Sequence, residues 1–435
     1  MNLRQIALRI LDEYEAGEKY INLSLSSHLT DKLSREDKAA LTALLYTSVE
    51  KKLTYDYYIC ALSKRSEKDI DPHTKNILRL GLCQILDMHS IPDFAAVNET
   101  VKLASGKGER AFVNGVLRTA AREKENLPTP DPKKNYNRYL SVKYSFPLPL
   151  VKHFDLIFGS EKTEKLLEFY NTEKYTDITV NTTKISVDNY LKLLCDKQIL
   201  AEMNPYVEQS IRIRKSVNPE LLPGFDDGYF FVQDRASAIA VSILSPKDED
   251  VIVDCCAAPG GKSFASAILA SDGCSIHSFD LHESKISLIT SGAKRLGLNS
   301  VKAGQRDALV IDESLIGVCD KVICDAPCSG LGVLGKKPDI RYKDLTVLDQ
   351  LPTLQLDILS SVSRYLKSGG EMIYSTCTLN PSENERVVES FIDTNSDFEL
   401  VPFDIGLISA PNGHTTLLPF VHGTDGFFIA KIRSK

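Results

Sequence analysis

The stretch that most constrains the fold is residues 251–263, with the sequence VIVDCCAAPGGKS. Three β-branched residues favour a buried strand, and the turn Pro259-Gly260-Gly261 is followed by apolar residues at helical spacing. A strand that passes through a tight glycine turn into a helix aims free backbone N–H groups and the positive end of the helix dipole beyond the strand. The stretch therefore predicts an α/β domain with a nucleotide-like ligand at this turn.

Acidic residues follow the next three predicted strands. Asp280 ends a strand at 275–279, Asp307 follows one at 301–305, and Asp325 ends one at 321–324. An acid about twenty positions after the glycine turn can accept both hydrogen bonds of a ribose diol. The turn lacks the glycine spacing of dinucleotide folds and of P-loops. A ribose, an adenine amino group and a cationic centre would suit these acids, which favours S-adenosylmethionine as the ligand.

Strands and helices alternate from Asp250 onward, and we assign residues 226–435 to one Rossmann-like α/β domain. Apolar residues at helical spacing predict helices at 286–296 and 354–366, and a strand is expected at 371–375. This alternation is typical of a parallel sheet with helices on both faces. A further helix is expected at 384–393, and residues 427–432 are expected to form an antiparallel edge strand.

The remainder of the chain divides into three parts, so the protein is expected to be multidomain. Residues 1–125 carry apolar side chains at helical spacing between short turns, which predicts an all-α bundle. Residues 126–138 contain three prolines and form a linker. Residues 139–225 are expected to form a small α+β segment, with helices at 162–171 and 187–195 and strands at 177–181 and 209–213.

Composition restricts the class of protein. The chain contains ten cysteines without disulfide-like spacing or a C-x-x-C pair, which fits a reducing cytoplasm and no metal site. We expect a soluble protein, since no apolar run is long enough for a membrane span and no export signal is evident. The net charge of −6 means that any RNA contact would have to come from local basic patches.

Two cysteines stand apart from the other eight. A cysteine in such a chain is most often a small buried hydrophobe. Cys328 and Cys377, however, each lie in a turn just after a predicted strand, on the side where the ligand and Lys262 are expected. A nearby cation and a following helix lower the pKa of a thiol, so we expect both to supply reactive thiolates.

Taken together, three motifs carry a resemblance to a known family: CAAPGGK, DAPCSG with a following PD, and STC followed by ENE. They resemble the RNA cytosine-C5 methyltransferases of the RsmB/NOP family. The amino-terminal segments ILRLG, IP with AVNE, and FVNGVLR are similar to the RNA-binding NusB fold. The resemblance covers nearly the whole chain. It implies a NusB-like bundle, a small RRM-like α+β segment and a class I S-adenosylmethionine-dependent methyltransferase domain.

The resemblance also implies the roles of the site residues. Cys377 would attack C6 of the target cytosine, Cys328 would assist product release, and Asp325 and Lys262 would contact the base. S-adenosyl-L-methionine is the implied cofactor, and 5-methylcytosine in 16S ribosomal RNA is the implied product. The implied cofactor-binding residues are Cys256, Ala257, Ala258, Pro259, Gly260, Gly261, Lys262, Asp280, Asp307 and Asp325.

A short basic stretch beside the Cys328 loop is the expected RNA contact. Its members are Lys336, Lys337, Arg341 and Lys343. They would bind RNA phosphates, although a solvated charged turn would have the same composition. The expected partner is 16S rRNA or a small-subunit assembly intermediate, bound by a monomeric enzyme.

Three rival interpretations remain at this point. A non-catalytic RNA-binding or antitermination protein would explain the amino-terminal part but leaves the two cysteines without a role. An NAD-dependent dehydrogenase would share the sheet and Asp280 but needs a pyrophosphate loop that the chain lacks. A transfer RNA or large-subunit RNA could replace 16S rRNA as the substrate, because no motif here reads a base sequence.

Overall fold

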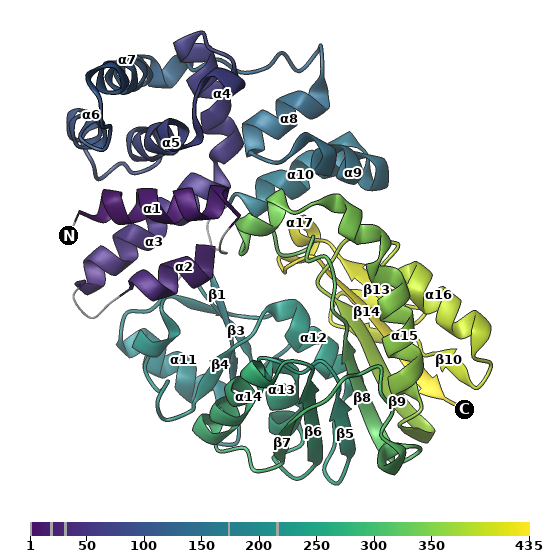
Figure 1. Ribbon diagram of the computed structural model, residues 1–435. Helices are drawn as coiled ribbons and strands as arrows, with labels where there is room; N and C mark the ends of the chain where they lie inside the picture. The colour runs from purple at the N-terminus through teal and green to yellow at the C-terminus, as the bar shows by residue number, and fades with distance from the viewer. Residues whose placement is uncertain (1, 18–20, 30–32, 173–174, 215–216) are drawn as a thin grey trace. The chain divides into compact units, whose positions relative to one another are not determined.

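The computed structural model describes residues 2–17, 21–29, 33–172, 175–214 and 217–435. The chain forms two compact units (Figure 1). A helical unit contains residues 1–171 and Lys337–Lys343, and a second unit contains Thr172–Lys336 and Asp344–Lys435. The sequence-based division at residues 125, 138 and 225 differs from this one, because three helices after the proline-rich stretch pack with the amino-terminal helices. These are α8 (Tyr136–Tyr144), α9 (Leu148–Phe158) and α10 (Ser160–Tyr170).

The predicted helical character of the amino-terminal part is confirmed for the described residues. Its helices are α1 (Leu3–Glu15), α2 (Ile21–His28), α3 (Arg35–Glu50), α4 (Lys52–Ser63), α5 (Pro72–Leu86), α6 (Asp93–Val101) and α7 (Lys107–Glu123). Asp71 caps α5 by accepting a hydrogen bond from Thr74 N–H at 2.9 Å. The apolar side chains of α5 are buried almost all round, and a Cβ at Gly81 would lie 2.5 Å from Leu117 of α7. A small residue at this position therefore lets α5 and α7 approach closely.

A small antiparallel sheet opens the second unit. Its strands are β1 (Thr176–Val180), β2 (Ala201–Met203), β3 (Ser210–Ile213) and β4 (Phe230–Val232), in the order β2-β3-β1-β4. Helix α11 (Val187–Asp196) packs on it through Tyr190 and Leu194. The predicted strands and helices of this segment are confirmed. Strand β4 lies within residues 226–435, which the sequence assigns to the Rossmann-like domain, but it pairs with β1 of the small sheet.

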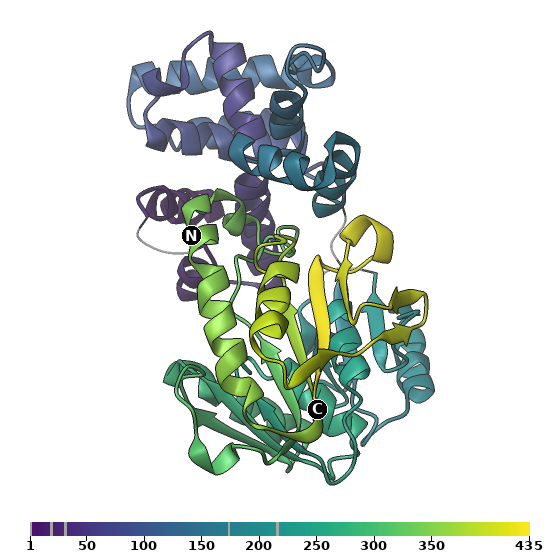
Figure 2. The same ribbon diagram turned by 90° about the vertical axis from the view of Figure 1, so that its right-hand side faces the viewer.

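The large sheet has the order β10-β14-β9-β8-β5-β6-β7, and β13 pairs with β14. Strands β5 to β9 run parallel, as predicted. Strand β14 is antiparallel to β9 but is not an edge strand, because β10 and β13 pair with it as well (Figures 1 and 2). The bounds are β5 (Val251–Asp254), β6 (Ser275–Asp280), β7 (Val301–Gln305), β8 (Cys319–Asp325), β9 (Leu366–Thr376), β10 (Phe398–Leu400), β13 (His414–Leu417) and β14 (Phe427–Ser434).

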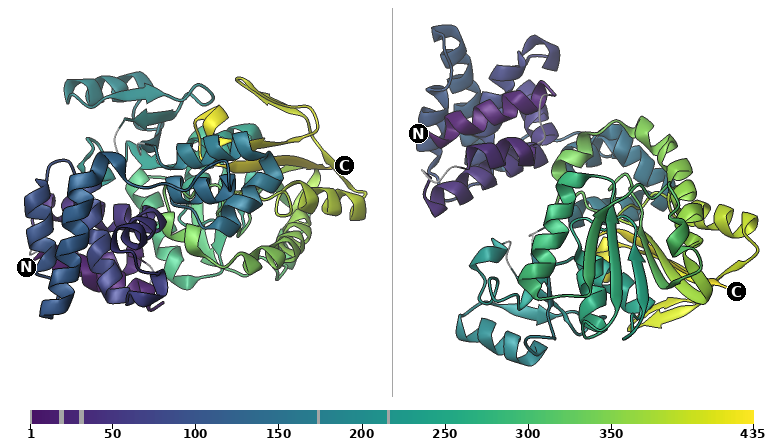
Figure 3. Two further views of the ribbon diagram at one scale, coloured as in Figure 1. Left: turned by 90° about the horizontal axis from the view of Figure 1, so that it is seen from above. Right: turned by 60° about the horizontal axis from the view of Figure 1, so that its bottom comes forward.

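Helices cover both faces of this sheet, as the alternation predicted (Figure 3). One face packs against α12 (Arg235–Leu244), α13 (Gly261–Leu269) and α14 (Glu283–Leu296), and the other against α15 (Leu351–Ser363) and α16 (Glu385–Thr394). Along β5, Ile252 faces the first layer and Val253 the second, since successive strand side chains point to opposite faces. Both residues are fully buried, which explains the continuous apolar run of this strand.

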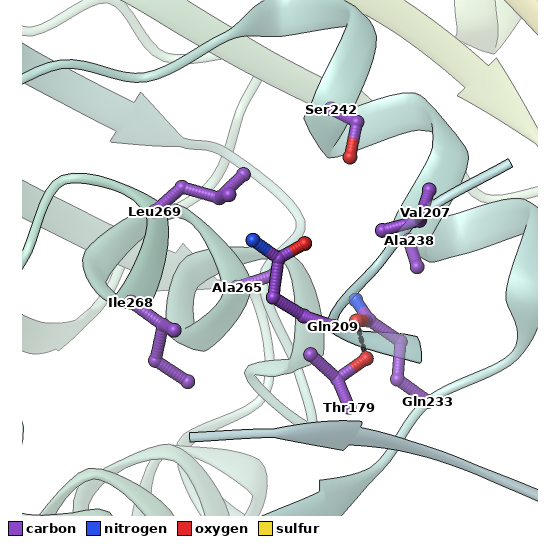
Figure 4. Close-up of a pocket in the computed structure, with 9 residues that line it drawn as sticks. All are labelled: Thr179, Val207, Gln209, Gln233, Ala238, Ser242, Ala265, Ile268 and Leu269. Atoms are coloured by element: carbon purple, nitrogen blue, oxygen red, sulfur yellow. Dashed lines mark hydrogen bonds between the residues drawn. The ribbon is translucent and has the colours of Figure 1, made fainter. Parts of the chain in front are cut away.

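A small cavity marks where the small sheet meets α12 and α13 (Figure 4). It encloses about 10 Å³, room for about one water molecule, and Thr179 on β1 donates a hydrogen bond to Gln233 beside it at 2.7 Å. The cavity is therefore a packing feature. Separately, none of the helices in the described ranges is both long and apolar enough to cross a bilayer.

Candidate active site

The glycine turn has the predicted strand–turn–helix geometry. Strand β5 ends at Asp254, and α13 begins at Gly261. Ala257 N–H donates to the carbonyl of Phe279 at 2.7 Å, which fixes the turn to the end of β6. Gly260 adopts a φ of 108°, and a Cβ there would lie 2.4 Å from the Phe264 ring. Only glycine fits this position without strain, because an L side chain rarely adopts that backbone conformation.

The three predicted acids lie at the carboxyl ends of β6, β7 and β8. Asp280 accepts hydrogen bonds from Ala258 N–H at 3.3 Å and His282 N–H at 3.0 Å, so it links the glycine turn to β6. Asp307 accepts one from Leu309 N–H at 2.9 Å. The geometry thus brings the acids to the edge of the sheet that carries the glycine turn. Their contacts with a ligand stay predictions.

Asp254, at the end of β5, received no role in the sequence analysis. Burial raises the pKa of its carboxyl to about 7. Ser263 donates a hydrogen bond to one carboxyl oxygen at 2.7 Å, while the other oxygen has no hydrogen-bond partner among the described residues. Its position directly before the cysteine and glycine residues is the one sequence signal that could have identified it.

Lys262 and Asp325 form an ion pair, with Nζ and Oδ2 2.6 Å apart. Ser375 lies opposite Asp325 in the register of β8 and β9 and donates to its Oδ1 at 2.7 Å. The Lys262 ammonium also lies 5.3 Å from the centre of the Phe427 ring. Lys262 from α13 and Ser375 from β9 thus converge on the Asp325 carboxylate of β8, and Phe427 of β14 supports the lysine. Ser375 was not singled out from the sequence, because only the strand register shows its partner.

The two predicted thiols are neighbours. Cys328 follows β8, Cys377 follows β9, and their sulfur atoms are 3.3 Å apart. Both residues are half-buried. The hydrogen bond to Cys377 and burial raise the pKa of the Cys328 thiol well above its usual value. The expectation that both thiols have a lowered pKa is therefore wrong for Cys328, because its hydrogen bond to another thiol and its burial both oppose ionisation.

The predicted RNA contacts are placed unevenly. Lys336 Nζ lies 2.6 Å from an oxygen of Asp234 and 2.9 Å from one of Asp425. In the helical unit, Arg341 has a fully buried side chain that pairs with Glu50 and lies over the Phe146 ring. Lys336 is thus already paired with carboxylates, and the buried Arg341 side chain is not accessible to an RNA phosphate. Lys337 and Lys343 are exposed. A phosphate contact there stays a prediction.

Three family descriptions match successive parts of the chain. Residues 1–122 match the NusB family, residues 146–220 match the ferredoxin-like domain of RsmF/B-like methyltransferases, and residues 241–433 match the 16S rRNA methyltransferase RsmB/F family. These matches agree with the order of helical bundle, small α+β sheet and Rossmann-like domain. The predicted fold class is therefore confirmed.

Individual proteins extend the similarity to the full length. The chain is 34% identical to a probable ribosomal RNA small subunit methyltransferase B of Bacillus subtilis, over 100% of this chain and 99% of the relative. The crystal structure of PH0851 has a TM-score of 0.80 and 26% identity, with 100% of this chain and 99% of that one covered. A methyltransferase homologue from Pyrococcus horikoshii has a TM-score of 0.61 and 28% identity, with 69% and 99% covered.

Proposed function

The chain belongs to the RsmB/F family of 16S rRNA methyltransferases, and on that premise we propose that it methylates C5 of a cytosine in 16S rRNA through a covalent Cys377 adduct. Family membership makes it an S-adenosylmethionine-dependent rRNA methyltransferase, a transferase of the EC 2.1.1 class. The observation that carries the finer proposal is the 3.3 Å separation of the Cys328 and Cys377 sulfur atoms. Their two loops follow the strands that carry Asp325 and Ser375.

The residues around the glycine turn fit the cofactor. Asp254, Asp280 and Asp325 offer carboxylate acceptors at the ends of three strands, and one Asp254 oxygen is buried without a partner among the described residues. An ammonium group, a ribose diol and an adenine amino group are the matching donors. When bound, S-adenosylmethionine supplies an electrophilic methyl group.

A thiolate is needed because C5 of cytosine is too weak a nucleophile to take that methyl group directly. The Cys377 thiolate adds to C6, and the electron pair of the C5–C6 double bond makes C5 nucleophilic. C5 then attacks the methyl carbon. Asp325 hydrogen-bonds the cytosine edge and stabilises the proton at N3, and the ion pair to Lys262 holds its carboxylate in place.

Product release uses the second thiol. After transfer, a base removes the C5 proton, the C6–S bond breaks, and its electron pair returns to Cys377. The raised pKa of Cys328 keeps its proton in place. Its S–H can therefore donate to the departing sulfur 3.3 Å away and stabilise the charge that develops there. The target base must leave its stack to reach this site, at a cost of a few kcal/mol.

The test combines methyl transfer with trapping of the adduct. Wild type, Cys328→Ala and Cys377→Ala are incubated with labelled 16S rRNA and S-adenosylmethionine and resolved on a denaturing gel. We expect Cys328→Ala to accumulate a covalent protein–RNA band and Cys377→Ala to show neither band nor methylation. Cys195→Ala is the matched control, because Cys195 is exposed and outside the site.

Other outcomes would change the proposal in defined ways. A band from Cys377→Ala instead would reverse the roles of the two thiols. If wild type does not methylate naked 16S rRNA but methylates small-subunit particles, the substrate is an assembly intermediate. Maps of 5-methylcytosine in ribosomal and transfer RNA, with and without the gene, separate 16S rRNA from the other RNA classes.

A further inference from the structure

Glu383 is a buried carboxylate that the reaction described above does not use. It lies in the turn between β9 and α16, six positions after Cys377 in the sequence. Its side chain has no solvent exposure. A buried carboxylate is costly unless its oxygen atoms are fully hydrogen-bonded, so its surroundings must compensate for its charge.

Five donors surround this carboxylate. Oε1 accepts from the hydroxyl of Ser329 at 2.6 Å, the amide of Asn380 at 3.1 Å and the hydroxyl of Thr378 at 3.3 Å. Oε2 accepts from the backbone N–H of Ser329 at 2.8 Å and the amide of Gln355 at 3.1 Å. An ionised carboxylate has the acceptor capacity for such a set. The donors are neutral, so their geometry, and not a cation, fixes the carboxylate.

The donors connect the two cysteine loops. Ser329 directly follows Cys328, and Thr378 directly follows Cys377. The two hydroxyl groups also lie 2.7 Å from each other. One carboxylate therefore accepts hydrogen bonds from the residue next to each thiol and links the two loops.

Gln355 on α15 adds a hydrogen bond to Glu383 from outside the two cysteine loops. Its amide donates to Glu383 and also to the carbonyl of Pro327 at 2.9 Å. The Cys328 loop is thereby held on both sides of the thiol, at Pro327 and at Ser329. Helix α15 packs in the layer on one face of the sheet and supplies a rigid support for this contact.

We propose that Glu383 is a positioning residue for the reaction: its carboxylate clamps the two cysteine loops and sets the distance between the thiols for addition and release. This inference rests on the proposed function, because it assumes that both thiols act on the RNA. The pKa of Cys328 supports it. After the hydrogen bond to Cys377 and burial, the negative charge of Glu383 is among the causes that raise this pKa and keep the thiol protonated.

The first test is Glu383→Gln, which keeps the volume of the side chain. The new amide NH2 group would replace one carboxylate oxygen and would point at groups that themselves donate hydrogen bonds. The backbone N–H of Ser329 can only donate, so it would lose its partner if the NH2 group took the place of Oε2. We expect kcat for 16S rRNA to fall by about 10²-fold, the loss typical of a misplacement of about 1 Å. Affinity for S-adenosylmethionine should be unchanged. Glu389→Gln, at an exposed position of α16, is the matched control.

A second pair of variants tests the same inference if Glu383→Gln does not fold. Thr378→Val preserves the shape of the side chain but removes its hydroxyl, which donates to Glu383 and accepts from the N–H of Asn380 at 3.2 Å; Thr378→Ser restores the hydroxyl. We expect Thr378→Val to lose about 10-fold in kcat, the equivalent of one hydrogen bond of about 1.4 kcal/mol, and Thr378→Ser to recover most of it. If the cluster served only to stabilise the fold, kcat would not be lost in Thr378→Val and restored in Thr378→Ser.

The third readout measures the positions of the thiols directly. Diamide oxidises two neighbouring thiols to a disulfide and takes up the two hydrogen atoms. The wild-type chain should form a Cys328–Cys377 disulfide rapidly, seen by peptide mass mapping, whereas Glu383→Gln should form it at least several-fold more slowly. Equal rates in the two proteins would overturn the positioning role.

The outcomes separate this inference from the proposed function. If Cys377→Ala is inactive while folded Glu383→Gln and Thr378→Val both match wild type, the positioning role fails and the proposed function stands. If Cys377→Ala retains methyl transfer, the proposed function fails first. If Glu383→Gln does not fold, the Thr378 pair decides, and full activity of Thr378→Val overturns the inference.

Discussion

Two lysine–aspartate pairs in the second unit have the same short distance and different surroundings. Lys262 and Asp325 lie 2.6 Å apart where α13 meets the ends of β8 and β9, next to the two thiols. Lys336 lies at the same distance from Asp234 and also pairs with Asp425, at the start of α12 and before β14. Each pair has one partner that is about one-third exposed, Asp325 in the first and Lys336 in the second. The first pair joins one cation to one carboxylate, whereas Lys336 has three carboxylates around it, with Asp177 at 3.9 Å as the third. Distance alone therefore does not distinguish a reactive pair from a structural one.

Asp325→Asn should have the largest effect. The substitution keeps the shape but replaces the charged carboxylate that stabilises the proton at N3 by a neutral amide, so kcat should fall by about 10²-fold or more. The free energy of unfolding should fall by only about 1 kcal/mol, because the Lys262 side chain is 9% exposed and loses its charged partner, but Asp325 is one-third exposed and an amide oxygen can still accept from the ammonium. Steady-state methyl transfer and urea unfolding measured on the same preparations check both parts. A large loss of stability with normal kcat would remove the distinction between the two pairs.

Lys336→Met should show the opposite pattern. Without the ammonium group, the half-buried carboxylates of Asp234 and Asp425 lose their shared cation. Because the Lys336 side chain is 36% exposed, we expect a loss of about 2 kcal/mol in the free energy of unfolding, below the range for a fully buried pair. Urea unfolding measures it, with the exposed Lys337→Met as the control. An unchanged midpoint would show that this pair carries no structural role.

The same cluster predicts a pH dependence of stability. Burial, followed by the charge of Asp234, raises the pKa of Asp425 from 3.8 to about 7. The folded state then holds a proton that the unfolded state releases, so this group lowers stability as pH rises from about 4 to about 7. The slope is at most about 1.4 kcal/mol per pH unit. Asp425→Asn should flatten the curve in that window, and an unaltered curve would count against the raised pKa.

The smallest expected effect concerns the exposed lysines Lys337 and Lys343. If Lys337 and Lys343 contact phosphates, replacing both by Gln should make the dependence of RNA affinity on salt shallower by about 1 per lysine. Filter binding of 16S rRNA across a salt series measures this slope. A slope identical to wild type would place the RNA contacts elsewhere on the protein.

Local patterns predicted the chemistry-bearing part of the fold well. The run at 251–254, the glycine turn and the acids after β6 and β8 depend on neighbours in the sequence, and the structure places them as expected. Helices α8 and α9 were not predicted from the sequence. Helix α9 begins with Pro147 at its N-cap and Pro149 in its first turn, where proline is tolerated. The edge position of β14 was wrong, since its second neighbours β10 and β13 come from short strands with weak patterns.

The sequence by itself determined which strands end in a carboxylate or a thiol, because strand period, glycine turns and helix starts are encoded within a few residues. Only the tertiary structure decided which of these groups meet. Ser375 reaches Asp325 through the register of two strands fifty residues apart, Lys336 is paired with carboxylates from distant segments, and Glu383 joins the loops of Cys328 and Cys377. The reason is physical: hydrogen bonds and ion pairs require atoms within about 3 Å, and packing sets such distances between segments that no local pattern relates.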